Sequence, residues 1–238
     1  MKALIQIVLC LLVETSLYAQ TTTVKLEILK AAFDADSVSF LDQFVQDWMN
    51  KTPMIQPSEL QRLDDTLRSL YSLYFDFMHA HREELDSSLN IVQNALDFRL
   101  VTSFEDSDEP NGPFSRVHDF RPRLPHPANY IVYIDTEYAT ILSHFLLQEN
   151  GQVPPLLRDE AKTRHQFLSH RLVLPEGHWG NYWLLSTAPS ISLVQIDRRL
   201  TSAIIHYNDG DYSWWVAKVK KTRRGKWIID QERLIGIQ

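Results

Sequence analysis

Residues 203–237 have the sequence AIIHYNDGDYSWWVAKVKKTRRGKWIIDQERLIGI, and this stretch determines the class of fold. Runs rich in β-branched and aromatic residues are separated here by short polar segments. The runs are Ala203 to Tyr207, Tyr212 to Lys220 and Lys226 to Ile237. Asp209-Gly210 is typical of a tight hairpin turn, and Arg224-Gly225 marks the next turn. Consecutive strands joined by short turns pair antiparallel, so the sequence predicts a closing β-meander.

Alternation along the middle run predicts which face is buried. Successive side chains of a strand point to opposite faces, so Trp215, Ala217 and Val219 share one face, which has a core-like composition. Trp214 and Lys218 lie on the other. Further upstream, strands are expected at Leu172 to Leu174, Tyr182 to Leu185 and Ser192 to Ile196.

The first part of the chain has helical periodicity instead. Residues 24–50 are expected to be helical, with Ser37 as a helix-capping residue and an apolar stripe along one face. The stripe consists of Val38, Leu41, Phe44, Val45 and Trp48. A second helix is expected from Ser58 to about His81, opened by a capping box of Ser58 and Gln61. These two helices could form a hairpin laid on a sheet.

The middle of the chain combines both patterns. Segments at 91–101 and Tyr130 to Ile134 are expected to be extended, and helices are expected after Thr136 and near 158–169. Residues 103–129 are rich in Pro, Asp and Gly, which predicts a long irregular connection. The fold class expected for residues 20–238 is a single α+β domain, with N-terminal helices packed on a curved antiparallel sheet.

Residues 1–19 have the layout of a cleaved export signal. Lys2 is followed by an apolar run from Ala3 to Val13, and Ala19 offers a small residue for cleavage. The alternative is a buried N-terminal helix. Cleavage would remove Cys10, the only cysteine, and leave no thiol or disulfide. The sequence therefore predicts an exported protein, periplasmic or extracellular.

Charge and hydropathy limit the partners. The net charge of −6 argues against a nucleic-acid-binding protein, which needs a basic face. The basic cluster of Lys218, Lys220, Lys221, Arg223, Arg224 and Lys226 is interpreted mainly as a solvated turn. No apolar run after the signal reaches the roughly 20 residues of a spanning helix, so no membrane span is expected. The oligomeric state is left open.

Two family resemblances follow from particular segments. The leading helices and the closing strands with Gly225-Lys226-Trp227-Ile228-Ile229 resemble the NTF2-like superfamily, which implies a cone with a cavity, here with insertions. The segments His118 to Pro122, Tyr130 to Leu147 and Gly177 to Trp183 resemble an uncharacterised family of exported bacterial proteins. The signal's Ala-Gln end is similar to those of exported Bacteroidota proteins, which implies a Gram-negative source. This second resemblance implies no activity.

The densest group of unusual residues is Gly177-His178-Trp179-Gly180-Asn181-Tyr182-Trp183. We predict that His178, Trp179, Asn181, Tyr182 and Trp183 could line a ligand pocket, with a tight, core-plugging connection as the alternative. In the long connection, His118 is a further candidate, and Arg121 could anchor a carboxylate or phosphate. A structural ion pair of Arg121 is the alternative.

Recognised catalytic and metal-binding patterns are not found. The histidines at His79, His81, His165 and His170 lack companion ligands at a known spacing, so no metal is expected. The sequence has no nucleophile elbow, phosphate-binding loop or dinucleotide fingerprint, and no cofactor is expected.

These observations favour a binding protein for a small molecule, glycan or envelope partner in a concave, aromatic-lined site. The first alternative, implied by the NTF2-like resemblance, is a lyase or isomerase with a buried acid–base pair. The second is a structural envelope protein. No catalytic residue is assigned.

Overall fold

The protein has an α+β fold in the computed structural model, which describes residues 22–81, 89–92, 96–102, 104, 114–123, 130–132, 136–174, 189–209 and 213–237. The chain divides into two compact units. The first unit comprises Met1–Asn50 and Ile134–Arg171, and the second comprises Lys51–Tyr133 and Leu172–Gln238. The predicted export signal and the predicted strand at Tyr182 to Leu185 lie outside the described residues.

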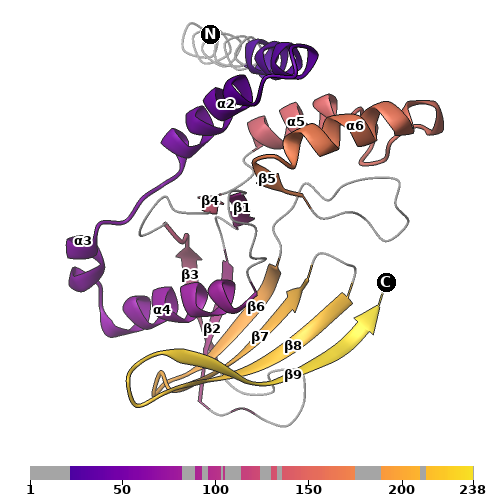
Figure 1. Ribbon diagram of the computed structural model, residues 1–238. Coiled ribbons are helices and arrows are strands. Elements are labelled where there is room, and N and C mark those ends of the chain that lie inside the picture. Colours follow the sequence, from indigo (N-terminus) through magenta and orange to yellow (C-terminus); the bar gives the residue numbers. More distant parts are fainter. Residues whose placement is uncertain are drawn as a thin grey trace, which may run out of the picture. The chain divides into compact units, whose positions relative to one another are not determined.

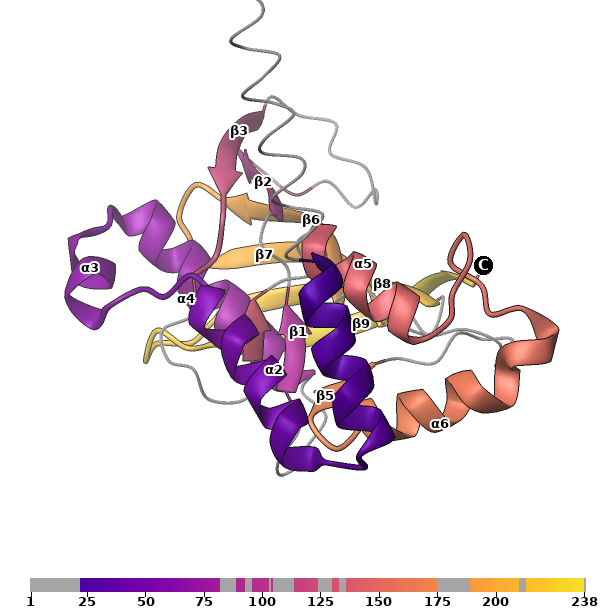
Figure 2. The same cartoon turned by 90° about the horizontal axis from the view of Figure 1, so that it is seen from above.

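The first unit is helical. Residues 22–34 form a helix that is followed by α2 (Val38–Lys51), and Figure 2 shows the two as a helical hairpin. The helices α5 (Thr136–Phe145) and α6 (Arg158–Leu168) complete the unit, with the 3-10 turn η1 (Pro155–Leu157) before α6. Aromatic rings pack edge to face in its core, where the ring centroids of Phe33 and Phe145 are 5.8 Å apart.

The predicted helix at 24–50 is in fact two helices. Asp36 adopts a left-handed conformation with φ 47°, which ends the first helix. The backbone N–H of Asp36 donates to the carbonyl of Phe33, and that of Ser37 donates to the carbonyl of Ala32. This pair of bonds is the Schellman arrangement that closes a helix, and aspartate tolerates the left-handed position better than most residues.

The second unit contains a six-stranded sheet in the order β3-β2-β6-β7-β8-β9 (Figure 1). Its strands are β2 (Leu96–Val101), β3 (Phe114–Phe120), β6 (Ser190–Asp197), β7 (Ser202–Asn208), β8 (Ser213–Lys221) and β9 (Trp227–Ile237). Strands β6 to β9 pair antiparallel in sequence order, so the predicted meander is confirmed. The pairing of β2 with β6 is parallel. Strand β3 occupies part of the expected irregular connection at 103–129.

Two helices precede this sheet in the second unit. The helix predicted from Ser58 to His81 is interrupted, because α3 (Pro57–Arg62) ends before α4 (Asp65–Ala80) begins. The side chain of Asp64 accepts a hydrogen bond from the backbone of Leu67 and starts α4 anew. The capping box is also displaced: Glu59 accepts from the backbone N–H of Gln56, so Ser58 and Gln61 do not form it.

The helix α4 lies along one face of the six-stranded sheet (Figure 1). Its apolar side chains and those of the sheet form the core of the second unit. Leu70, Phe77, Phe98, Ile205 and Ala217 are among the buried members of this core. Ala217 and Val219 are buried in it and Trp215 packs against it, which confirms the face predicted for β8. Val216, on the opposite face, is buried as well.

A second, three-stranded sheet has the order β4-β1-β5 and is parallel. Its strands are β1 (Leu89–Val92), β4 (Tyr130–Val132) and β5 (Leu172–Val173). The sequence indicated extended backbone at each of these places but not their pairing. Across the described part of the chain, no helix has the length and apolar character needed to cross a membrane.

Candidate functional site

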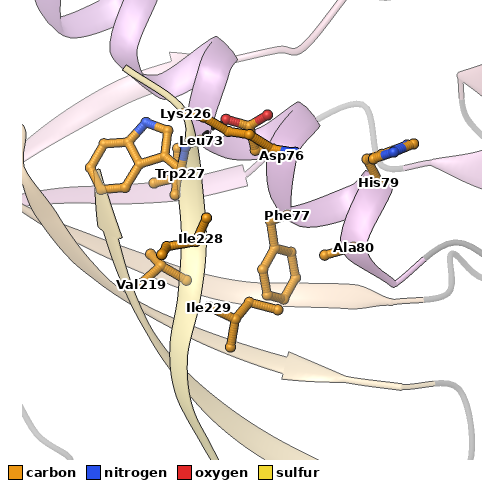
Figure 3. A pocket seen from close by; sticks show the side chains of 10 residues that line it. All are labelled: Leu73, Asp76, Phe77, His79, Ala80, Val219, Lys226, Trp227, Ile228 and Ile229. Atoms are coloured by element: carbon orange, nitrogen blue, oxygen red, sulfur yellow. Dashed lines mark hydrogen bonds between the residues drawn. The ribbon is translucent and has the colours of Figure 1, made fainter. Parts of the chain in front are cut away.

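A pocket of about 200 Å³ lies between the second half of α4 and the β8–β9 hairpin (Figure 3). The described residues that line it all belong to the second unit. The lining residues are Leu73, Asp76, Phe77, His79, Ala80, Val219, Lys226, Trp227, Ile228 and Ile229. Most of these side chains are apolar, and the exceptions are Asp76, His79 and Lys226. The pocket is therefore an apolar hollow with a few charged or titratable groups.

Helical periodicity explains the α4 wall. Leu73, Asp76, Phe77 and Ala80 are spaced by three or four residues, which places them on one face of the helix. Phe77 is buried at the base of this wall, whereas Ala80 is exposed at the end of the helix. Ala80 is thus a position where a larger side chain would fill the pocket without disturbing the core.

One hydrogen bond joins the two walls. The Asp76 carboxylate accepts a 2.8 Å hydrogen bond from the backbone N–H of Trp227, the first residue of β9 (Figure 3). This bond fixes the start of β9 against α4. The Trp227 ring is buried, and the Lys221 ammonium lies 5.4 Å from the ring centroid, within the range of a cation–π contact.

The three charged or titratable residues of the pocket differ in their exposure to solvent. Lys226 and His79 are both exposed. In Figure 3 the His79 ring points away from the apolar side chains. Asp76 is half-buried and held by its bond to Trp227. Lys226 is therefore the exposed cation next to the apolar hollow.

A second polar group joins the end of α4 to the sheet. The His81 Nε2 atom lies 2.8 Å from a Glu232 carboxylate oxygen and 3.2 Å from the Tyr207 hydroxyl. The Tyr207 hydroxyl donates to the same Glu232 oxygen at 2.7 Å. His81 Nδ1 lies 3.0 Å from the Phe77 carbonyl, which can only accept, so Nδ1 carries a proton.

Tyr207 is kept neutral by this arrangement. Burial raises the pKa of Tyr207 well above its ordinary value, and the carboxylates of Glu232 and Asp209 raise it further. His81, Tyr207 and Glu232 are thus hydrogen-bonded to one another. None of the three is among the pocket's lining residues.

The first unit holds a different polar cluster. The Lys25 ammonium lies 2.9 Å from the Glu137 carboxylate and 3.3 Å from that of Asp47. It also donates to the Tyr138 hydroxyl at 3.2 Å, and Tyr138 donates to Asp47 at 3.0 Å. The buried Tyr138 ring stacks on Trp48 with centroids 4.6 Å apart. Burial raises the pKa of Tyr138, while Lys25 opposes that rise.

The described residues that line the pocket do not include any of the site residues predicted from the sequence. His178, Trp179, Asn181, Tyr182 and Trp183 lie outside the described residues, so their prediction stays untested. His118 lies on β3, and Arg121 is exposed just after that strand. The neighbouring Arg123, which the sequence did not single out, approaches Glu59 at 3.3 Å.

His79 and His81 have different surroundings in the structure. His79 borders the pocket, while His81 belongs to the hydrogen-bonded group with Tyr207. No group of three or more potential metal ligands occurs among the residues that the structure describes. Sequence reasoning missed Asp76 as a site residue, although Trp227 lies in the Gly-Lys-Trp segment that carried the NTF2-like resemblance.

The chain has no match among known protein families, among curated proteins or among solved structures.

Proposed function

We propose that this is an exported binding protein that takes up a small, largely apolar molecule in the pocket between α4 and the β8–β9 hairpin. The observation that carries the proposal is the pocket itself, with Phe77, Trp227 and Ile229 along an apolar hollow. Small-molecule sites are concave and mainly apolar, with a few polar groups that orient the ligand. This composition matches that description.

The volume of the pocket limits the ligand. Drug-sized ligands occupy clefts of roughly 300–1,000 Å³, whereas an engineered apolar cavity of roughly 150 Å³ holds benzene. At about 200 Å³, the pocket has room for a single aromatic ring or for two fused rings. A glycan fits less well, because sugars require many polar partners and the Trp227 ring is buried rather than offered as an open platform.

The finer fold proposed here is an NTF2-like cone with insertions. It is supported by a helix laid on a mostly antiparallel sheet and by a pocket between that helix and the last two strands. An experimental structure in which the sheet does not wrap around α4 would contradict it. His178 and Trp183 remain proposed ligand contacts, and alanine at both positions is expected to weaken binding without unfolding the protein.

The pocket can be tested by filling it. Calorimetric titration with indole, a two-ring apolar probe, is expected to show binding to the natural protein and none to Ala80→Phe. The matched control is Gln61→Phe, which places the same ring on an exposed position of α3 away from the pocket. Equal binding by the natural protein and Ala80→Phe would locate the ligand elsewhere.

A second candidate is an NTF2-like lyase or isomerase, because His81, Tyr207 and Glu232 form a partly buried acid–base group. Mass spectrometry of a ligand retained from the cell envelope distinguishes the two functions. A ligand recovered unchanged after prolonged incubation supports binding. A product that no longer forms with Glu232→Gln supports catalysis.

Native mass spectrometry of the same preparation addresses export and assembly. A chain that begins at Gln20 would support cleavage of residues 1–19. A discrete oligomer without any bound small molecule would favour the structural envelope protein over the binding protein.

A further inference from the structure

The β8–β9 hairpin concentrates positive charge beside the pocket. Residues 218–226 contain six Lys and Arg side chains, although the whole chain has a net charge of −6. Lys226 closes this segment and also lines the pocket. The segment at the edge of the pocket is therefore opposite in sign to the chain as a whole.

Two of these cations already have partners. Lys220 forms an ion pair with Asp230 on the adjacent strand. Lys221 donates to the Ser69 hydroxyl at 3.1 Å and lies over the Trp227 ring. Both side chains thus hold the hairpin to its own sheet and to α4.

The other four cations of the segment do not form such contacts in the described part of the chain. The four are Lys218, Arg223, Arg224 and Lys226; all are exposed, and none forms an ion pair with the residues that the structure describes. Of these four, Lys226 is the one that borders the apolar hollow. Its ammonium is free to pair with a group on a bound molecule.

Asp76 is the carboxylate that could oppose an anion among the lining residues. Its carboxylate accepts the backbone N–H of Trp227 at 2.8 Å, and the Ser72 hydroxyl lies 3.5 Å from the same oxygen. A hydrogen bond from a backbone N–H compensates part of a carboxylate's charge. Asp76 is therefore already engaged by the backbone of β9, whereas Lys226 is exposed beside the hollow.

We propose that the pocket prefers ligands with a ring-sized apolar body and a carboxylate, the ring lying among Phe77, Trp227 and Ile229 and the carboxylate at Lys226. This preference rests on the proposed binding function. Pairing at an exposed ammonium contributes modestly and is screened by salt. The carboxylate is expected to improve affinity about three- to five-fold at low ionic strength.

Three indole derivatives separate charge from shape. Indole-3-acetate, indole-3-acetamide and tryptamine share one ring system and carry a negative, a neutral and a positive side chain. Titration calorimetry at about 0.01 M ionic strength is expected to rank them in that order. At about 1 M, where the Debye length is about 3 Å, the ranking should collapse.

A pair of charge-removing variants locates the effect. Lys226→Gln is expected to abolish the advantage of the acetate over the acetamide. Lys218→Gln is the matched control, because Lys218 is exposed on β8 and does not line the pocket. It removes the same charge from the same hairpin and should preserve the advantage.

The outcomes distinguish the two levels of the proposal. Equal affinity for all three probes, or tightest binding of tryptamine, would overturn the anion preference and leave the pocket intact. Loss of the acetate's advantage in both variants would show a diffuse effect of net charge and would also overturn the role of Lys226. Binding of none of the probes would refute the proposed function and this inference together.

Discussion

The two units both bury a tyrosine whose hydroxyl donates to a carboxylate, but the other groups around the two hydroxyls differ. In the first unit Tyr138 contacts a cation and an anion, Lys25 and Asp47. In the second unit the Tyr207 hydroxyl donates to Glu232, and the same carboxylate is bound by His81. A carboxylate therefore accepts from the tyrosine in both clusters, and a lysine also contacts the hydroxyl in the first.

This difference determines how each hydroxyl responds to charge. Lys25 would stabilise a negative Tyr138 and so opposes the increase in its pKa that burial causes. The carboxylates near Tyr207 act in the same direction as burial. Two tyrosines that are buried to a similar extent can therefore have different charged neighbours. Substituting each tyrosine tests the unit in which it lies.

The largest expected effects come from the two cores. Trp48→Ala removes a buried ring from the first unit, and Phe98→Ala removes one from the second. Each is expected to lower the free energy of unfolding by about 3–5 kcal/mol, because a large cavity replaces close packing. Denaturant titration measures this loss.

Hydrogen exchange then shows how the loss is distributed. If the units unfold separately, Trp48→Ala reduces protection in α2 and α5, and Phe98→Ala reduces it in β6 to β8. Equal loss in both units with either variant would show a single cooperative domain, which is the organisation that the sequence predicted for residues 20–238.

A smaller effect is expected from removing each hydroxyl. Tyr207→Phe deletes one donor to Glu232 but retains the contact of that carboxylate with His81, so we expect a loss of about 1–2 kcal/mol. Tyr138→Phe removes contacts to both Lys25 and Asp47, which still face each other at 3.3 Å, and a similar loss is expected. Thermal unfolding compares the two variants. No loss in either would mean that water replaces the hydroxyl.

High pH sharpens the comparison further. The folded-state pKa of each tyrosine is raised above that of an unfolded tyrosine, which is about 10. The stabilisation is therefore complete below about pH 10 and decreases as pH rises above that value, because the unfolded chain loses its proton first.

Denaturant titrations between about pH 8 and 11 test this behaviour. The natural protein should lose stability over the upper part of the range, and each Tyr→Phe variant should lose less than the natural protein does. A variant whose stability falls in parallel with the natural protein would show that its tyrosine does not contribute.

The parts of the fold that could be predicted are those determined by residues close together in the sequence. Alternation and turn residues placed β6 to β9, since hairpins join neighbours in sequence. Helix ends were less predictable: Asp36 and Asp64 stop or start helices through backbone geometry and a side-chain cap. The parallel pairing of β2 with β6 and the small sheet of β1, β4 and β5 connect distant segments, and no local pattern encodes such pairs.

The candidate pocket was not predicted from the sequence. The segment around Trp227 was singled out for its family resemblance and its turn, not as a site. Asp76 was not predictable, because its role depends on a hydrogen bond across 151 positions of sequence. His79 and His81 lie at the end of α4 and point in different directions, as expected of positions two apart on a helix. His79 lies at the pocket's edge, and His81 contacts Tyr207 and Glu232.

The smallest expected effect concerns the turns, where each unit contains a glycine with positive φ. Gly151 has φ +79° and Gly225 has φ +84°, and at neither position would an added Cβ meet any atom within 4 Å. The cost of alanine there is therefore conformational only, about 1 kcal/mol in each unit. Gly236 on β9 provides the control, because it has equal space without positive φ, and alanine should be neutral or slightly stabilising. Thermal unfolding of the three single variants measures the difference. A loss at Gly236 equal to that at Gly225 would show that β9 needs glycine for a reason other than backbone conformation.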